Sequence, residues 1–108
     1  MRGENTRPTA VLTLNDRVAI GLMDGFRELG IRVPEDISVI GYDNMEVGAF
    51  VSPQLTTIDA KPDELIRKAT ESLLAHIRGN HEAEPISICP RLLIRASTGA
   101  VPKTQRIK

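Results

Sequence analysis

The sequence predicts an α/β domain built on two parallel strands joined by a helix. Two runs of apolar, β-branched residues, at 9–14 and 37–42, have the length and composition of buried strands. The residues between them repeat their apolar positions at helical spacing. A strand–helix–strand unit of about 35 residues forms a right-handed crossover with both strands parallel. The expected fold class is therefore α/β, a parallel sheet with flanking helices, and the 108 residues suffice for one domain at most.

The first strand and helix follow a polar segment. Residues 1–8 are charged and end in proline, so we expect a disordered lead-in. The strand at 9–14 stops at Asn15 and Asp16, whose side-chain oxygens accept hydrogen bonds from the first turn of a helix. Gly30 supplies the left-handed residue that commonly closes a helix. The apolar face of this helix consists of Ala19, Leu22, Met23, Phe26 and Leu29.

The second strand and the loop after it are marked by Pro34, Gly41 and an unusually apolar connection. Pro34 and Gly41 bracket the run 37–42, and Asp43 follows it directly. Residues 45–52 have no clean period, which predicts a loop with at most a short turn of helix. Its apolar residues either pack on the domain or meet another chain. They are Val47, Ala49, Phe50 and Val51.

The remaining elements are a third strand, a second helix and a broken strand. Residues 55–59 form a shorter strand candidate, and Pro62 begins an amphipathic helix that ends near Gly79. The β-like runs 86–89 and 91–95 are separated by a proline, which predicts a bent strand, an edge strand or two separate strands. The basic residues 99–108 are expected to form a flexible tail.

Composition argues against several function classes. The 14 basic and 14 acidic residues cancel, so no basic field favours nucleic acid. The single Cys89 fits a reducing compartment or a secreted chain without disulfides, and its apolar surroundings predict a small buried residue instead of a nucleophile. His76 and His81 are five residues apart, which does not match a helical metal pair. With neither a signal peptide nor a membrane span, we expect a soluble cytoplasmic chain, with no metal, no cofactor and no enzyme activity.

Three polar residues are the candidate ligand-binding residues. Asn15, Asp16 and Asp43 each lie at the carboxyl end of a predicted parallel strand, where ligands bind in open α/β sheets. Carboxylates and amides in such a position suit hydroxyl-rich neutral ligands such as sugars. The alternative is structural: Asn15 or Asp16 only caps the helix, and Asp43 is only a turn residue.

The order of these motifs resembles the C-terminal part of the lactose-repressor and galactose-repressor (LacI/GalR) family of bacterial transcription regulators. Residues 8–16 end in Leu-Asn-Asp16, and residues 28–44 include Val33-Pro-Glu-Asp36 and end in Gly-Tyr-Asp-Asn44. The segment Ser52-Pro-Gln-Leu-Thr-Thr-Ile58 follows, and the similarity extends over residues 8–98.

The resemblance implies a partial periplasmic-binding-protein-like (type I) fold, with residues 9–98 forming the C-terminal portion of a sugar or effector-binding domain, mainly its C-terminal lobe. It implies that Asn15 and Asp43 contact the effector and that Asp16 is the neighbouring acid of the same motif. The strand at 56–59 would cross between lobes.

The resemblance also implies an arrangement of the other lobe and a dimer. The helix from Pro62 would belong to the other lobe, and the strand from Ile86 would cross back. Homodimers would associate through the helix face around Ile20 and the segment around Phe50 and Val51.

The function implied is effector binding and dimerisation in a DNA-binding repressor, the partner being a small-molecule effector, expected to be a sugar. Operator DNA would be reached only through an N-terminal helix-turn-helix, which these 108 residues do not contain. Two alternatives stay open: a sugar-binding protein of a transport system, and a truncated stand-alone dimerisation module.

Overall fold

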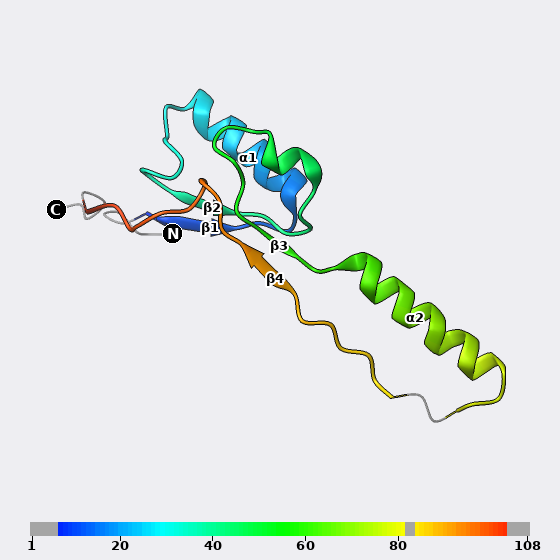
Figure 1. Cartoon of the computed structure of the whole chain (residues 1–108). Coiled ribbons are helices and arrows are strands. Elements are labelled where there is room, and N and C mark those ends of the chain that lie inside the picture. The colour runs from blue at the N-terminus through cyan, green and yellow to red at the C-terminus, as the bar shows by residue number, and fades with distance from the viewer. Residues whose placement is uncertain (1–6, 82–83, 104–108) are drawn as a thin grey trace.

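The computed structural model describes residues 7–81 and 84–103 (Figure 1). Its elements, in chain order, are β1 (Ala10–Leu12), α1 (Asp16–Glu28), β2 (Ser38–Ile40), the 3-10 helix η1 (Glu46–Ala49), β3 (Thr57–Asp59), α2 (Pro62–Ile77) and β4 (Arg91–Leu93). The two predicted helices are present, and the strands are shorter than predicted. Residues 1–6 of the predicted lead-in and 104–108 of the predicted tail lie outside the described residues.

Strands β1 and β2 pair in parallel, and α1 covers one face of the pair (Figure 1). Val11 lies opposite Val39 in the register. The buried core joins Ala19 and Met23 of α1 to Val39 of β2 and to Leu55, which precedes β3. The predicted crossover unit is confirmed, because the apolar stripe of α1 faces the apolar side of the sheet.

Helix α1 begins and ends where its local sequence predicts. The side-chain Oδ1 of Asn15 accepts a hydrogen bond from the Val18 N–H at 2.9 Å, which satisfies one free donor of the first turn. Gly30 has φ 75°, a left-handed conformation that costs glycine little. The Ile31 N–H donates to the Phe26 carbonyl at 2.9 Å, so the last turn is closed by the backbone.

The turn that leads into β2 is closed by one arginine–aspartate pair. Arg32 Nε and Nη2 donate to Asp36 Oδ2 and Oδ1 at 3.1 and 2.9 Å, and the Arg32 N–H donates to Oδ2 at 2.8 Å. These hydrogen bonds lower the pKa of Asp36 to about 2, because they favour the ionised carboxyl. The turn between α1 and β2 is thus closed by a local ion pair, while Val33 within it packs against the core.

Strands β3 and β4 form a separate antiparallel ribbon. It is joined to the first sheet by a parallel bridge between Ile40 and Thr56 and by a hydrogen bond from the Asp43 N–H to the Ile58 carbonyl. Of the two β-like runs around Pro90, only Arg91–Leu93 forms a strand, so the expectation of a strand at 86–89 was wrong. Cys89 is exposed, which corrects the prediction of a buried residue.

The chain after β4 returns to the first sheet. Ser97 is fully buried, and its hydroxyl donates to the Val39 carbonyl at 2.6 Å and accepts from the Thr56 N–H at 2.9 Å. Gly99, which the sequence assigned to the tail, donates its N–H to Ser38 Oγ at 3.0 Å. These hydrogen bonds hold residues 97–99 beside β2.

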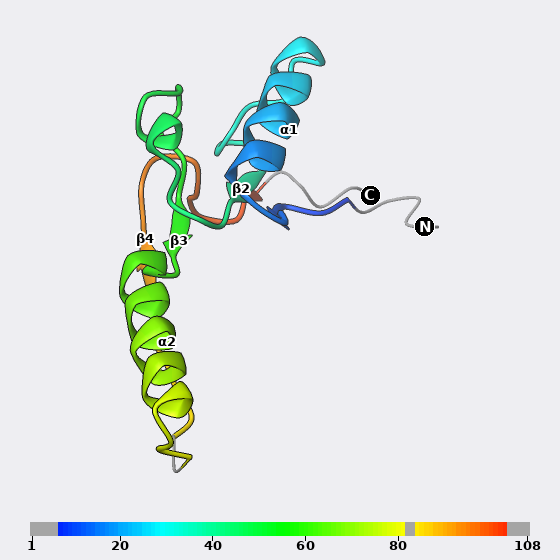
Figure 2. The ribbon, with the colours of Figure 1, turned by 90° about the vertical axis from the view of Figure 1, so that its right-hand side faces the viewer.

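Helix α2 extends away from the α1–β1–β2 unit in both views (Figures 1 and 2). It begins with Pro62 in the first turn, as predicted, but none of its residues is buried within the described structure. Ile66 and Ile77, on the predicted apolar face, are 62% and 69% exposed. No helix in residues 7–81 or 84–103 has the length and hydropathy that crossing a bilayer requires.

Gly41 is a packing constraint between β2 and the start of α1. A Cβ at this position would overlap Asp16 Oδ1 and lie 3.0 Å from Leu55 Cδ2 and 3.1 Å from the Asp16 Cα. Because Asp16 and Leu55 are both fully buried, neither has room to move aside.

We predict that Gly41→Ala destabilises the intact protein by about 1–3 kcal/mol, through overpacking. Gly21→Ala is the matched control, because Gly21 is exposed on α1 and nothing lies within 4 Å of a Cβ added there. The control should be neutral or about 0.5–1 kcal/mol more stable, from helix propensity. Urea unfolding followed by circular dichroism measures both, and equal stability of the two variants would contradict the packing argument.

Candidate functional site

The carboxyl ends of β1 and β2 meet at one edge of the sheet, as predicted. The Asp16 N–H donates to the Tyr42 carbonyl at 2.9 Å, and Thr13 Oγ1 donates to the Ile40 carbonyl at 2.9 Å. These contacts bring the segment containing Asn15 next to the segment that leads to Asp43. The edge is the place where a parallel α/β sheet presents polar groups to a ligand.

Asn15 and Asp16 have different structural roles at this edge. Asn15 is half-buried and caps α1, so the structural alternative is correct for its Oδ1. Asp16 is fully buried, and its Oδ2 accepts from the Met45 N–H at 2.7 Å. Its Oδ1 accepts from Thr57 Oγ1 at 2.5 Å. Asp16 therefore supports the loop after β2, and the expectation that it faces a ligand is corrected.

The loop after β2 presents its side chains from an unusual backbone. Asp43 and Asn44 have φ 117° and 53°, values that non-glycine residues rarely adopt. The Asp43 N–H donates to the Ile58 carbonyl at 2.9 Å, and the Asn44 N–H donates to Thr57 Oγ1 at 3.2 Å. Strained backbone held by surrounding contacts is common at ligand sites. Here the contacts come from β3 and leave the Asp43 side chain exposed.

A cavity of about 410 Å³ lies beside this loop. It is lined by Asp43, Asn44, Asp59, Lys61, Pro62, Asp63 and Glu64. The predicted ligand residue Asp43 is part of it, whereas Asn15 and Asp16 are not among its lining residues. Sequence reasoning missed Asn44 and the lining residues between 59 and 64, although Asp59 ends the third predicted strand and Asp43 follows the second. Four carboxylates, one amide and one ammonium can bind a ligand rich in hydrogen-bond donors.

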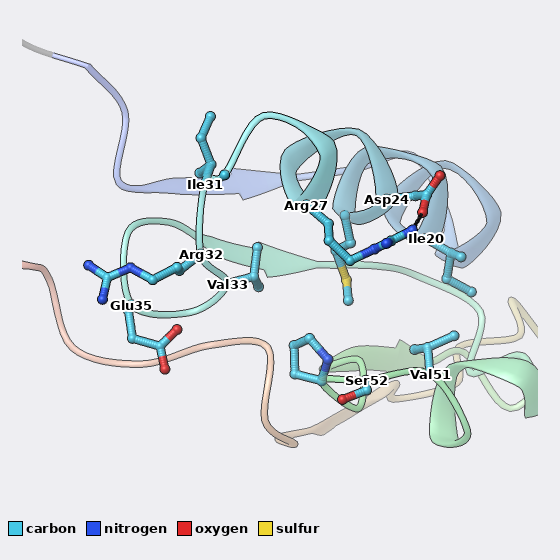
Figure 3. Close-up of a pocket in the computed structure, with 12 residues that line it drawn as sticks. Ile20, Asp24, Arg27, Ile31, Arg32, Val33, Glu35, Val51 and Ser52 are labelled. Carbon is cyan, nitrogen blue, oxygen red and sulfur yellow. Dashed lines mark hydrogen bonds and ion pairs between the residues drawn. The ribbon is translucent and has the colours of Figure 1, made fainter.

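A second cavity, also of about 410 Å³, lies between α1, the turn at residues 30–35 and the segment 51–53 (Figure 3). It is formed by the face of α1 that carries Ile20 and by the segment around Val51 (Figure 3). Both residues are half-buried against the core, while the neighbouring Phe50 is 78% exposed. Ile20 and Val51 thus lie beside the same cavity, and Phe50 is the next residue along the chain; their role in a dimer stays a prediction.

Metal-binding side chains do not gather anywhere in the described part of the chain: no group of three or more His, Cys, Asp or Glu residues could hold an ion there. His76 and His81 pack edge to face with ring centroids 4.3 Å apart, and their Nδ1 atoms are 3.2 Å apart. This pair supplies two possible ligands, fewer than a metal site in a protein needs.

The sequence of residues 1–98 matches the model of the periplasmic binding protein-like domain family. The chain belongs to this family. It is 46% identical over 90 residues to the HTH-type transcriptional repressor PurR of Vibrio vulnificus. The aligned residues cover 82% of this chain and 27% of that repressor. The chain thus spans just over a quarter of the length of this curated relative.

Solved structures of LacI-type regulators have the same fold. The lac repressor dimer bound to operator and the anti-inducer ONPF aligns with a TM-score of 0.80 at 36% identity, covering 86% of this chain and 32% of that one. A LacI family regulator from Enterococcus faecium with bound ribose aligns with a TM-score of 0.75 at 38% identity, covering 83% and 34%. These matches confirm both the periplasmic-binding-protein-like α/β fold and the resemblance to the C-terminal part of LacI-type effector-binding domains.

The hydroxyl of Thr57 joins the buried Asp16 carboxylate to the loop after β2, residues 43–45, which we call the ligand loop. Removal of this hydroxyl therefore has a predictable cost. Thr57→Val keeps the shape but leaves Asp16 Oδ1 and the Asn44 N–H without this partner. We expect a loss of about 1–3 kcal/mol of stability. Thr57→Ser keeps the hydroxyl and loses one methyl group, about 1 kcal/mol. Urea unfolding of both variants is the measurement, and a valine variant more stable than the serine variant would refute the role of the hydroxyl.

Proposed function

We propose that this chain is the effector-sensing and dimerising part of a cytoplasmic LacI-family repressor and has no enzyme activity. The observation that carries the proposal is the strained Asp43–Asn44 loop, which presents polar side chains to a cavity at the carboxyl edge of a parallel sheet. The named relatives are a transcriptional repressor and LacI-type regulators, which supports the same assignment.

The effector is proposed to be a sugar. Exposed Asp43 accepts hydrogen bonds, and the amide of Asn44 both donates and accepts, which suits a hydroxyl-rich molecule. The regulator from Enterococcus faecium was solved with ribose bound, and it is 38% identical to this chain over the aligned residues, which cover 34% of that regulator. The other class to test is a nucleobase, since N–H and carbonyl edges can pair with the same side chains.

The proposed mechanism is a shift between two arrangements of the lobes. An effector that binds one arrangement more tightly increases its population by that difference in affinity. The arrangement favoured by the effector then alters the spacing of DNA-binding segments elsewhere in the full regulator. The segments that respond are the loop after β2 and β3, because Asp43, Asn44 and Asp59 line the cavity together.

Replacing Asp43 with asparagine tests the site. Asn keeps the shape and tolerates positive φ, but it removes the charge that strengthens hydrogen bonds from a ligand. We expect about 10–100-fold weaker binding in the intact protein, since a hydrogen bond to a charged group contributes about 1.5–3 kcal/mol. Isothermal titration with D-ribose, lactose and adenine measures the affinity.

The matched control is Glu46→Gln, an exposed acid in η1 that lines neither cavity. It should bind as the unmodified protein does. Equal affinity of the Asp43→Asn protein and the control would overturn the assignment of Asp43. Binding of adenine but neither sugar would replace the proposed effector class and leave the site in place.

Dimerisation is proposed to use the face around Ile20, Phe50 and Val51. Phe50 is 78% exposed beside a cavity of about 410 Å³, and a large aromatic side chain next to a hollow is typical of an interface anchor. The lac repressor in the matching structure is a dimer. A two-fold contact would place the same patch of each copy against the other.

Phe50→Ser is therefore expected to weaken self-association of the intact protein by at least about 30-fold, the equivalent of about 2 kcal/mol at an anchor residue. Val101→Ser is the control, because Val101 is 71% exposed but lies in the C-terminal segment. Sedimentation velocity at a series of concentrations gives both dissociation constants. A Phe50 variant that dimerises as tightly as the Val101 variant would exclude this face.

Two other functions are separated from the first by DNA binding and ligand binding. A sugar-binding protein of a transport system would bind sugar but no operator DNA. The match of this chain to the periplasmic binding protein-like domain model is equally compatible with such a protein. A stand-alone dimerisation module would self-associate without ligand. Operator binding by the intact protein that is altered by an effector favours the repressor over both.

A further inference from the structure

Arg95 connects the segment after β4 to the ligand loop. Its Nη2 donates to Asn44 Oδ1 at 3.1 Å, across 51 residues of sequence. Its Nη1 donates to the Leu55 carbonyl at 3.1 Å, and its backbone N–H donates to Thr56 Oγ1 at 2.9 Å. The Arg95 side chain thus joins Asn44, which lines the cavity, to the segment before β3.

The contact with Asn44 is the one that bears on a ligand. Asn44 lines the cavity beside the ligand loop and has φ 53°, so its side-chain direction depends on contacts that hold this backbone. Arg95 fixes the amide: because Oδ1 accepts from the guanidinium, the NH₂ group must point the other way. An amide oriented in this manner offers a donor to the cavity next to the exposed Asp43 carboxylate.

The position of Arg95 also matters for the lobes. It lies two residues after β4, which pairs with β3 in the antiparallel ribbon. The ribbon leads to α2 and away from the α1–β1–β2 unit (Figure 2). A change in the direction of the ribbon would therefore move Arg95, and with it the Asn44 amide.

We propose that Arg95 is a positioning residue that orients Asn44 for the ligand and makes this orientation depend on the β3–β4 ribbon. The proposal rests on the proposed function as an effector-binding site. Arginine suits the task because its planar fork reaches two acceptors in fixed directions. Lysine carries its three donors on one freely rotating nitrogen, so it does not hold the Leu55 carbonyl and Asn44 Oδ1 in the fixed directions that the arginine fork sets.

The first test needs no ligand. Backbone amide hydrogen exchange in the intact protein is compared for Arg95→Ala and Arg91→Ala; Arg91 is an exposed arginine on the same ribbon. With Arg95→Ala we expect at least tenfold faster exchange at Asn44 and Met45, and unchanged exchange in β1 and β2. Unchanged exchange at Asn44 and Met45 would overturn the proposal. Uniformly faster exchange would also overturn it, in favour of a purely structural role.

The second test is a double-mutant cycle on binding. Asn44→Gly removes the amide and keeps the positive φ without strain. Arg95→Ala and Asn44→Gly should each weaken the binding of D-ribose, lactose or adenine about tenfold, and the double variant should be no weaker than either. Arg95→Lys should bind the same ligand several-fold more weakly than the unmodified protein does, and Arg91→Ala should bind it with unchanged affinity. Additive losses, or full binding by Arg95→Lys, would refute positioning through Asn44.

The two proposals fail differently. If Asp43→Asn loses binding but Arg95→Ala keeps it, the effector site stands and the role of Arg95 falls. If the unmodified protein binds none of the three probes, the effector proposal is contradicted for these classes, and the exchange measurement alone decides whether Arg95 fixes the loop.

Discussion

The structure depends on one buried carboxylate. Asp16 is fully buried, and burying a charge is costly unless hydrogen bonds replace its water. It receives two such bonds, from the Met45 N–H and the Thr57 hydroxyl, and it lies in the first turn of α1, where the helix dipole favours negative charge. One side chain therefore joins α1, the loop after β2 and β3. The same crowding explains why residue 41 must be glycine.

Local pattern was sufficient for the first half of the fold. The apolar periods predicted β1, α1 and β2 because each element is decided by neighbours in sequence, including the Asn15 cap and the left-handed Gly30. The roles of Asn15 and Asp16 could not be separated in this way, since either residue is a good cap. The buried role of Asp16 is decided by Met45 and Thr57, which lie 29 and 41 residues further along the chain. Reasoning from a single sequence does not place such distant partners.

The second half was harder to predict because its contacts are non-local. Arg95 belongs to an apolar run that looks like any short strand, yet its partners lie 40 and 51 residues earlier. Cys89 has β-like neighbours but precedes a proline outside the ribbon, so it is exposed. Asp59 ends β3 as Asp43 follows β2, and applying the strand-end argument a third time would have found it.

The exposed face of α2 is consistent with a domain of two lobes. An isolated 16-residue helix is marginal in water, and such helices are stabilised mainly by packing of an apolar face. Ile66 and Ile77 have no covering surface within the described residues, and the chain spans 27% of the Vibrio vulnificus repressor. A lobe that packs on α2 would act on the ribbon at the base of this helix. Since Thr57 of the ribbon also donates to Asp16, a change in the ribbon would reach the loop after β2 through this hydrogen bond.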